Sequence, residues 1–207
     1  SARQVIDDYF TYDMPIGYFL PNDGYGAGYG QNGYGKTGGV DNEGKSSQER
    51  LAAVAANVQN LADFTKYANE KGVATGLWTQ SYLTPDSNPK TEWQLLRDFK
   101  NEVKVVGVST FKTDVAWVGH GYSMQLDGVK TAYDIATTEG KVRPNIISLD
   151  GWAGSQRYCG IWTGDQYGGE WEYIRFHIPT YIGTSLSGNP NIGSDMDGIF
   201  GGNQLIA

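Results

Sequence analysis

Six short apolar runs alternate with segments of helical periodicity, and this alternation restricts the possible folds of the 207-residue chain more than any other feature. Short apolar runs separated by amphipathic helices are typical of βα units that build a parallel sheet. We therefore expect an α/β fold. The six runs are Ile16–Leu20, Val73–Trp78, Val108–Phe111, Asn145–Leu149, Cys159–Trp162 and Asn191–Gly193.

Four helices are expected between or after these runs, because apolar residues recur there at spacings of three and four. The clearest spans about Ser46 to Asn69 and opens on Ser46-Ser47-Gln48-Glu49, which has the form of a capping box. A second is expected from Thr91 to Val106, closed by Gly107, and a weaker one from Val129 to Thr138. The last runs from Glu170 to about Ser185 and carries Trp171, Ile174, Ile178, Pro179 and Ile182.

Aspartates follow five of the six runs, and Trp78 and Gln80 stand at the end of the sixth. One such Asp is ordinarily a turn or cap residue. In a (β/α) barrel all strand ends open on one face, where active sites lie, whereas a doubly wound sheet gathers only the ends near its switch point. Five aspartates in this position therefore favour the barrel. They are Asp23, Asp114, Asp150, Asp165 and Asp195.

The spacing of two of these aspartates predicts a shortened unit. Asp150 and Asp165 are too close in sequence to enclose a full helix between their strands. We expect this βα unit to be abbreviated.

Composition excludes several classes of function. Acidic residues outnumber basic ones by 23 to 16 and no basic cluster occurs, so neither nucleic acid nor an anionic membrane is an expected partner. No apolar run approaches the roughly 20 residues that span a bilayer. Cys159 is the single cysteine, which excludes an intrachain disulfide and a cysteine-based zinc site. His120 and His177 are isolated, no Gly-x-Ser-x-Gly occurs, and we expect no metal and no cofactor.

Carboxylates without such partners suit glycoside hydrolysis, which needs two carboxyl groups of different character. Lys112 lies close to Asp114 and would keep that carboxylate ionised, as a nucleophile requires. Asp165 stands between Trp162 and Trp171, and apolar surroundings would suit a general acid.

Aromatic residues are numerous, with 14 Tyr and 6 Trp. Most such side chains belong to cores and interfaces, but an aromatic ring also stacks on the flat C–H face of a pyranose. We expect some of them to line a sugar site, with carboxylates accepting bonds from sugar hydroxyls. The candidate substrate-binding residues are Asp23, Trp78, Lys112, Trp117, Asp150, Trp152, Arg157, Trp162 and Asp195.

Four motifs resemble glycoside hydrolase family 31: Lys112-Thr113-Asp114-Val115-Ala116-Trp117, Ala153-Gly154-Ser155-Gln156-Arg157-Tyr158, Ile161-Trp162-Thr163-Gly164-Asp165 and Gly193-Ser194-Asp195-Met196-Asp197-Gly198. The resemblance extends from about Val5 to Gly202. It implies a (β/α)8 TIM barrel of retaining α-glycosidases and α-glucan transglycosylases. By motif, Asp114 matches the catalytic nucleophile and Asp165 the general acid/base, with their carboxyl groups about 5–5.5 Å apart.

Within the family, the segments Asp13 to Gly26, Gly76 to Gln80 and Ser148 to Gly154 are similar to the 3-α-isomaltosyltransferases that form cycloalternan. This implies transfer of an isomaltosyl unit between α-glucan oligosaccharides and closure of a cyclic tetrasaccharide. Leu149 stands where α-glucosidases of the family carry an Arg, which favours a specialised member. Hydrolysis by the same pair, and carbohydrate binding without catalysis, are the alternatives.

Barrels of this family need eight strands, and the six runs match the second to the seventh. We expect residues 1–207 to be part of one catalytic domain, with the remaining strands and the flanking β-domains supplied by the remainder of a larger polypeptide. The resemblance also implies an extracellular location, secreted or at the cell surface.

Overall fold

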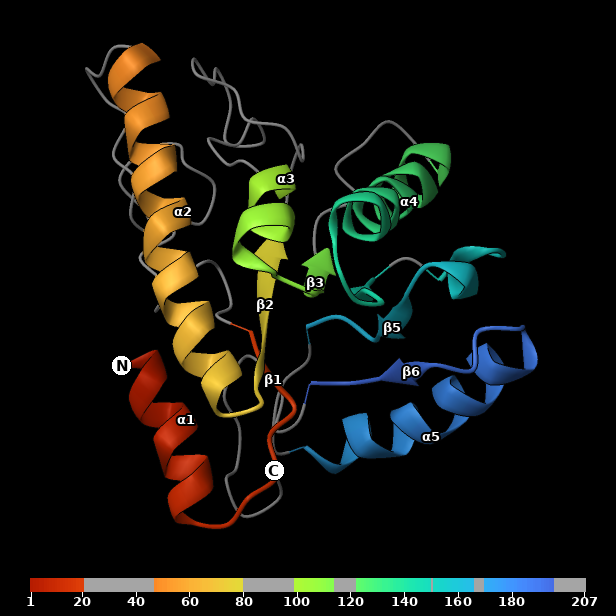
Figure 1. The fold of residues 1–207 in the computed structure, drawn as a ribbon. Coiled ribbons are helices and arrows are strands. Elements are labelled where there is room, and N and C mark those ends of the chain that lie inside the picture. Colours follow the sequence, from red (N-terminus) through yellow and green to blue (C-terminus); the bar gives the residue numbers. More distant parts are fainter. Residues whose placement is uncertain (21–46, 80–98, 114–121, 150, 166–169, 196–207) are drawn as a thin grey trace. The chain divides into compact units, whose positions relative to one another are not determined.

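The computed structural model describes residues 1–20, 47–79, 99–113, 122–149, 151–165 and 170–195 (Figure 1). The chain divides into two compact units. The first contains Ser1–Val115 and Thr131–Asn145, and the second contains Ala116–Lys130 and Ile146–Ala207.

All six expected strands are present. β1 (Tyr18–Phe19), β2 (Ala74–Thr79) and β3 (Thr110–Thr113) follow one another in the first unit, and β1–β2 and β2–β3 are parallel pairs. β4 (Asn145–Ser148), β5 (Gly160–Trp162) and β6 (Ile192–Gly193) follow in the same way, and β4–β5 and β5–β6 are again parallel. In both sets the strand order follows the chain order without reversal. A barrel requires this order throughout, whereas a doubly wound sheet reverses its order at a switch point.

The helices agree with the expected ones in position and differ at their ends. α2 (Ser47–Glu70) matches the first expected helix. α3 (Phe99–Asn101) continues into a π-helical turn at Glu102–Val106, and Gly107, with φ +87°, ends it. The earlier part of this expected helix, residues 91–98, lies outside the described residues. α4 (Tyr122–Glu139) begins seven positions earlier than expected, and α1 (Ala2–Thr11) was not expected at all.

Side chains alternate between the two faces of β2 and β3. Leu77 pairs with Phe111, and both are fully buried. The Phe111 ring lies 4.6 Å from that of Phe99 in α3, so this face of the strands packs against helix. Trp78 pairs with Lys112 in the next register position, and strand periodicity directs both to the opposite face.

The first unit also contains a cluster of buried residues that joins α1, α2 and the segment between α2 and β2. Ile6 of α1 packs with Phe64, Ala68 and Val73, each at most 3% exposed. The Phe19 ring of β1 lies 5.8 Å from that of Phe64. This apolar contact explains why the N-terminal helix folds onto α2.

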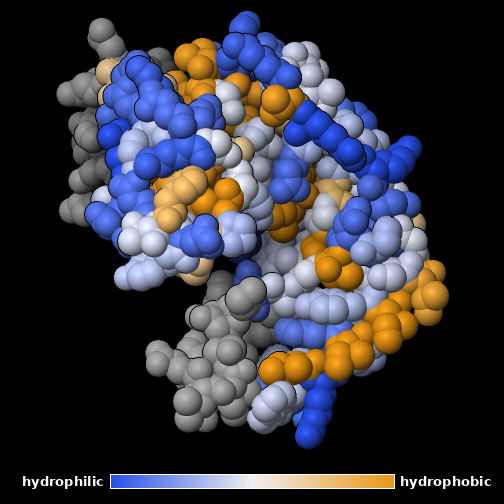
Figure 2. Space-filling view, turned by 60° about the horizontal axis from the view of Figure 1, so that its bottom comes forward, coloured by the Kyte–Doolittle hydropathy of each residue, from blue (hydrophilic) through white to orange (hydrophobic). Residues whose placement is uncertain are grey.

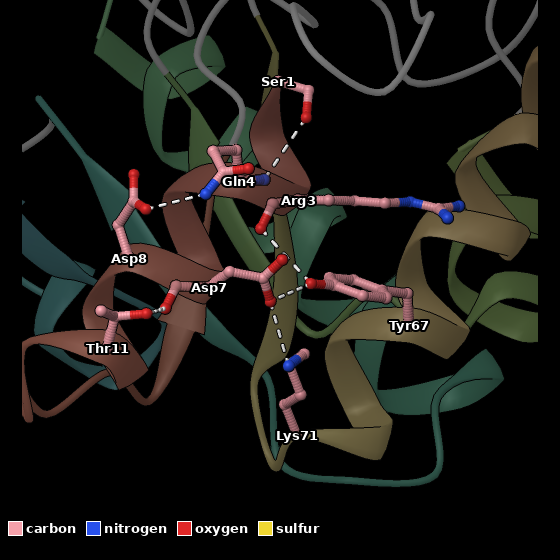
Figure 3. A network of polar contacts seen from close by, with 8 residues as sticks. All are labelled: Ser1, Arg3, Gln4, Asp7, Asp8, Thr11, Tyr67 and Lys71. Carbon is pink, nitrogen blue, oxygen red and sulfur yellow. Dashed lines mark hydrogen bonds and ion pairs between the residues drawn. The ribbon is translucent and has the colours of Figure 1, made fainter.

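Polar contacts add to this attachment (Figure 3). The Tyr67 hydroxyl donates to the Asp7 carboxylate, and Lys71 Nζ lies 3.0 Å from the same oxygen. The Arg3 guanidinium lies 5.0 Å above the centre of the Tyr67 ring. Tyr67 lies in the last turn of α2, and Lys71 directly follows the helix, four positions later. This spacing places both side chains on one side, so both reach the same carboxylate of α1.

The hydrogen bonds from Tyr67 and Lys71 lower the pKa of Asp7 below its ordinary value of 3.8. The bond to Asp7 in turn raises the pKa of Lys71 above 10.5. The contribution of the ionised Asp7 carboxylate to the stability of the folded state is therefore complete above pH 3.8, and it is lost as the pH falls through the lowered pKa of Asp7. The contribution of Lys71 is complete below pH 10.5 and is lost as the pH rises through its raised pKa.

We predict that Asp7→Asn loosens α1, because it removes the charge that Tyr67 and Lys71 share. Hydrogen exchange of the α1 amides at neutral pH should quicken about two- to fivefold, since exposed ion pairs contribute little. Asp8→Asn is the matched control, because Asp8 accepts a bond from Gln4 within α1 itself. Equal effects of the two variants would contradict the attachment.

The second unit contains the abbreviated βα connection that the spacing predicts. A single 3-10 turn, Ser155–Arg157, stands between β4 and β5 in place of a full helix. α5 (Trp171–Leu186) follows β5 and continues through Pro179.

No side chain of α5 is buried, and its large apolar residues lie at the surface. Figure 2 shows hydrophobic residues exposed on this face of the molecule. Those of α5 that are at least 39% exposed are Trp171, Ile174, Phe176, Ile178, Ile182 and Leu186. Among the described residues, no helix is both long and apolar enough to cross a membrane.

Candidate active site

Hydrogen bonds join the carboxyl ends of β5 and β6. Trp162 pairs with Gly193, and the Thr163 N–H donates to the Gly193 carbonyl oxygen over 3.0 Å. The Thr163 Oγ1 and Ser194 Oγ atoms are 2.8 Å apart. Because Asp165 and Asp195 follow these residues by two positions and one position, the parallel register brings the two aspartate-bearing ends side by side.

A tight turn leads from Thr163 to Asp165. Gly164 has a φ of +84°, a conformation that residues with a Cβ rarely adopt. A Cβ at Gly164 would also lie only 3.1 Å from the Leu149 Cδ2 atom. The positive φ thus favours glycine, and an added Cβ would have to displace the end of the Leu149 side chain. The turn presents the Asp165 side chain to solvent, whereas Asp195 is half-buried.

Tyr181 of α5 reaches this pair of strand ends. Its hydroxyl donates to Ser194 Oγ, so that helix, β6 and β5 are linked through consecutive hydroxyl groups. The Tyr181 ring stacks on that of His177, with centroids 5.6 Å apart and planes 5° from parallel. His177 is therefore a packing partner of Tyr181, one turn earlier on α5.

The connection between β4 and β5 carries two candidate sugar-binding residues. Trp152 is 37% exposed. Arg157 is also exposed, and its guanidinium lies 5.1 Å above the centre of the Tyr158 ring. Asn189 Nδ2 donates to the Gly151 carbonyl oxygen over 3.3 Å, which anchors the start of this connection. An exposed indole and an exposed guanidinium on an anchored segment suit contact with a polar ligand.

Two further candidates lie at the ends of β2 and β3 in the first unit. Trp78 is buried, at 3% exposure, and its register partner Lys112 is half-buried. Strand alternation places both on the face opposite Leu77 and Phe111. Asp114 follows Lys112 by two positions in the sequence.

Four of the candidate site residues lie outside the described residues: Asp23, Asp114, Trp117 and Asp150. Their roles stay predictions from the sequence. Among the described residues, no group of three His, Cys, Asp or Glu side chains is placed to hold a metal ion.

Among the residues that the structure describes, Trp162 and Trp171 do not enclose Asp165, and residues 166–169 lie outside the described part of the chain. Trp162 is buried at 5% exposure, Trp171 is 59% exposed, and the Asp165 carboxyl is exposed between them in sequence. Trp162 is the last residue of β5 and packs into the unit, whereas Trp171 begins the surface helix α5. Trp162, Asp165 and Trp171 are close in sequence, but the two indoles do not enclose Asp165, because the Gly164 turn follows Trp162 and Trp171 already belongs to α5.

Sequence reasoning missed the hydroxyl residues Thr163, Ser194 and Tyr181. The sequence does contain a pattern that could have indicated Thr163 and Ser194, because each is a hydroxyl residue directly after a strand and one or two positions before an aspartate. No such pattern indicates Tyr181, since its partner is 13 positions away and depends on how α5 packs.

Comparison with known protein families decides the assignment. The profile described as the glycosyl hydrolases family 31 TIM-barrel domain matches residues 46–205, which is most of the chain. The chain belongs to glycosyl hydrolase family 31. The six parallel strands are accordingly part of a (β/α)8 barrel, as the sequence predicted.

Relatives of this family 31 chain include glucosidases. The neutral alpha-glucosidase C of Mus musculus is 40% identical over 67 residues, which cover 32% of the chain and 7% of the mouse protein. An alpha-glucosidase of Saccharolobus solfataricus is 33% identical over 105 residues, which cover 46% of the chain and 15% of that protein. The chain therefore matches only a small part of the length of these relatives.

A solved structure agrees on the fold. The cycloalternan-degrading enzyme from Trueperella pyogenes, in complex with cycloalternan, superposes with a TM-score of 0.65 at 15% identity. The match covers 95% of this chain and 35% of the enzyme. At this identity the likeness supports the barrel fold alone.

We predict that Gly164→Ala destabilises the family 31 chain and lowers its activity. The left-handed backbone costs a residue with a Cβ about 1–2 kcal/mol, and the contact with Leu149 adds to this. Gly188→Ala is the matched control, because Gly188 has φ +93° but its added Cβ meets nothing within 4 Å. Thermal unfolding should show a larger loss for Gly164→Ala, and activity should fall only in that variant. Equal losses of stability in the two variants would contradict the role of the Leu149 contact.

Proposed function

We propose that the protein containing this chain cleaves α-glucosidic bonds in α-glucan oligosaccharides with net retention of anomeric configuration. In this proposal Asp114 is the nucleophile and Asp165 the general acid/base. The observation that carries it is the family 31 match over residues 46–205, which includes both aspartates. The exposed Asp165 carboxyl, on a turn anchored to β6, supports the proposal because a general acid must reach a bound substrate.

We further propose that the bond cleaved releases an isomaltosyl unit, which passes to a sugar acceptor and closes a cyclic tetrasaccharide. The resemblance to isomaltosyl-transferring enzymes supports this. So does Leu149, which stands where family α-glucosidases carry an Arg and packs against the Gly164 turn. An apolar side chain there removes a bidentate grip on the sugar, which argues for subsite contacts unlike those of a simple exo-glucosidase.

Hydrolysis is the second candidate, and the names of the similar proteins favour it. The mouse and archaeal relatives are α-glucosidases, and the solved structure is of an enzyme that degrades cycloalternan. Transfer and hydrolysis use the same two carboxyl groups and differ in whether a sugar or water enters as acceptor. A chain that only binds α-glucan is the third possibility.

Incubation of the intact protein with an isomaltosyl-containing α-glucan separates the candidates. Transfer predicts a cyclic tetrasaccharide among the products when they are resolved by chromatography and mass spectrometry. Release of glucose or isomaltose without larger products would favour hydrolysis. Bound but unchanged glucan would overturn catalysis and leave a binding role.

A further inference from the structure

We propose that Tyr181 is a positioning residue for Asp165 and acts on it through Ser194 and Thr163. The inference rests on the proposed function, in which Asp165 is the general acid/base. It adds a residue outside the family motifs, on a helix whose other side chains are largely exposed.

The first link joins α5 to β6. The Tyr181 hydroxyl donates to Ser194 Oγ, and this contact is partly buried. Ser194 directly follows β6 and directly precedes Asp195. If the Tyr181 hydroxyl moved away, the partly buried Ser194 hydroxyl would lose a hydrogen bond that water could replace only in part. This cost favours the paired arrangement and so holds the end of β6 in place.

The second link joins β6 to β5. Ser194 Oγ lies 2.8 Å from Thr163 Oγ1, again partly buried, and Thr163 N–H donates to the Gly193 carbonyl oxygen. Thr163 is thus held by its backbone and its side chain at once. When Tyr181 donates to Ser194, the Ser194 hydrogen is available for Thr163, so the three hydroxyls form one directional chain.

The third link is covalent and short. Only Gly164 separates Thr163 from Asp165, and this glycine is buried within a tight turn in which it has a φ of +84°. A shift of Thr163 therefore moves the Asp165 carboxyl with little slack. Proton transfer depends on placement within a fraction of an ångström, and a misplacement of about 1 Å costs on the order of 10²-fold in rate.

Tyr181 itself is held in place. Its ring is half-buried and stacks on the half-buried His177 ring on the preceding turn of α5. The stack restricts the ring, so the hydroxyl is presented to Ser194 without a large loss of side-chain freedom on each turnover.

The test is Tyr181→Phe in the intact protein, because Phe keeps the ring and its stack on His177 and removes only the hydroxyl. On unactivated α-glucan substrates we expect kcat to fall about 10- to 100-fold with KM little changed. On aryl α-glucosides with good leaving groups, kcat/KM reports the first step, which needs little protonation, and it should fall less than about threefold. Thr163→Val should show the same split, and Thr163→Ser, which keeps the hydroxyl, should restore the wild-type pattern.

Thr180→Val is the matched control, because it removes the neighbouring hydroxyl on α5, whose bond to the Phe176 carbonyl stays within the helix. It should leave both substrate classes unchanged. Equal losses on both classes in Tyr181→Phe, or a Thr163→Ser variant as impaired as Thr163→Val, would overturn the positioning role alone. An intact wild-type protein that cleaves neither substrate would overturn the proposed function and this inference with it.

Discussion

Asp114→Asn should lower turnover by several orders of magnitude and leave the fold intact. Asn has the shape of Asp but lacks the charge and the nucleophilic oxygen that attack the anomeric carbon. A retaining enzyme without its nucleophile cannot form the covalent glycosyl intermediate, so both hydrolysis and transfer should fail together. The measurement is kcat on an α-glucan oligosaccharide, with thermal unfolding as the check on folding.

A trapping experiment identifies the nucleophile independently of the rate. A 5-fluoro-glycosyl fluoride should label the peptide that contains Asp114 in the wild-type protein and leave it unlabelled in Asp114→Asn. Asp134→Asn is a suitable control, because it makes the same change at an exposed carboxylate of α4. Label on the peptide of Asp23 or Asp150 would assign the nucleophile to another strand end.

Asp165→Ala should lower kcat about 10²- to 10⁴-fold on natural α-glucans, the range that general acid catalysis supplies. Aryl glycosides with activated leaving groups should lose far less in the first step, because the departing oxygen needs no proton. Added azide should restore part of the turnover of such substrates, since a small anion can attack the glycosyl enzyme without the missing base. The expected product is the α-glycosyl azide, because azide would displace Asp114 from the β-glycosyl enzyme and so restore the α configuration.

The comparison of substrate classes decides this assignment. Equal losses on natural and activated substrates would show that Asp165 is not the acid. Asp195→Asn is the informative partner variant, because Asp195 follows the neighbouring strand end and is expected to bind sugar hydroxyls. It should lower activity on both classes alike.

Local sequence determined the strands and most of the helices. The runs that became β2 and β4 are apolar over the length of a strand, and Gly107 ends the helix before β3 where it was expected to. The shortened connection between β4 and β5 followed from spacing alone. Repetition of these units, with an aspartate after most strands, also predicted the barrel that the family match confirms. Such features depend on neighbours within a few positions, which a sequence displays directly.

The expected catalytic pair, Asp114 and Asp165, was predicted from motifs and not from periodicity or spacing. Asp165 is now seen at the end of β5, on a turn that Gly164 makes possible. Asp114 lies outside the described residues, so its role, like the extracellular location of the protein, stays a prediction.

Only the tertiary structure decided which side chains meet. Tyr67 reaches Asp7 across 60 positions, and Thr163 meets Ser194 across 31, because helix packing and strand register bring them together. It also decided that Asp165 is exposed while Trp162 is buried, and that α5 turns its apolar residues to the surface. Contacts of this kind depend on the relative placement of whole elements. Local periodicity shows which face of an element is apolar, and packing alone determines what lies against that face.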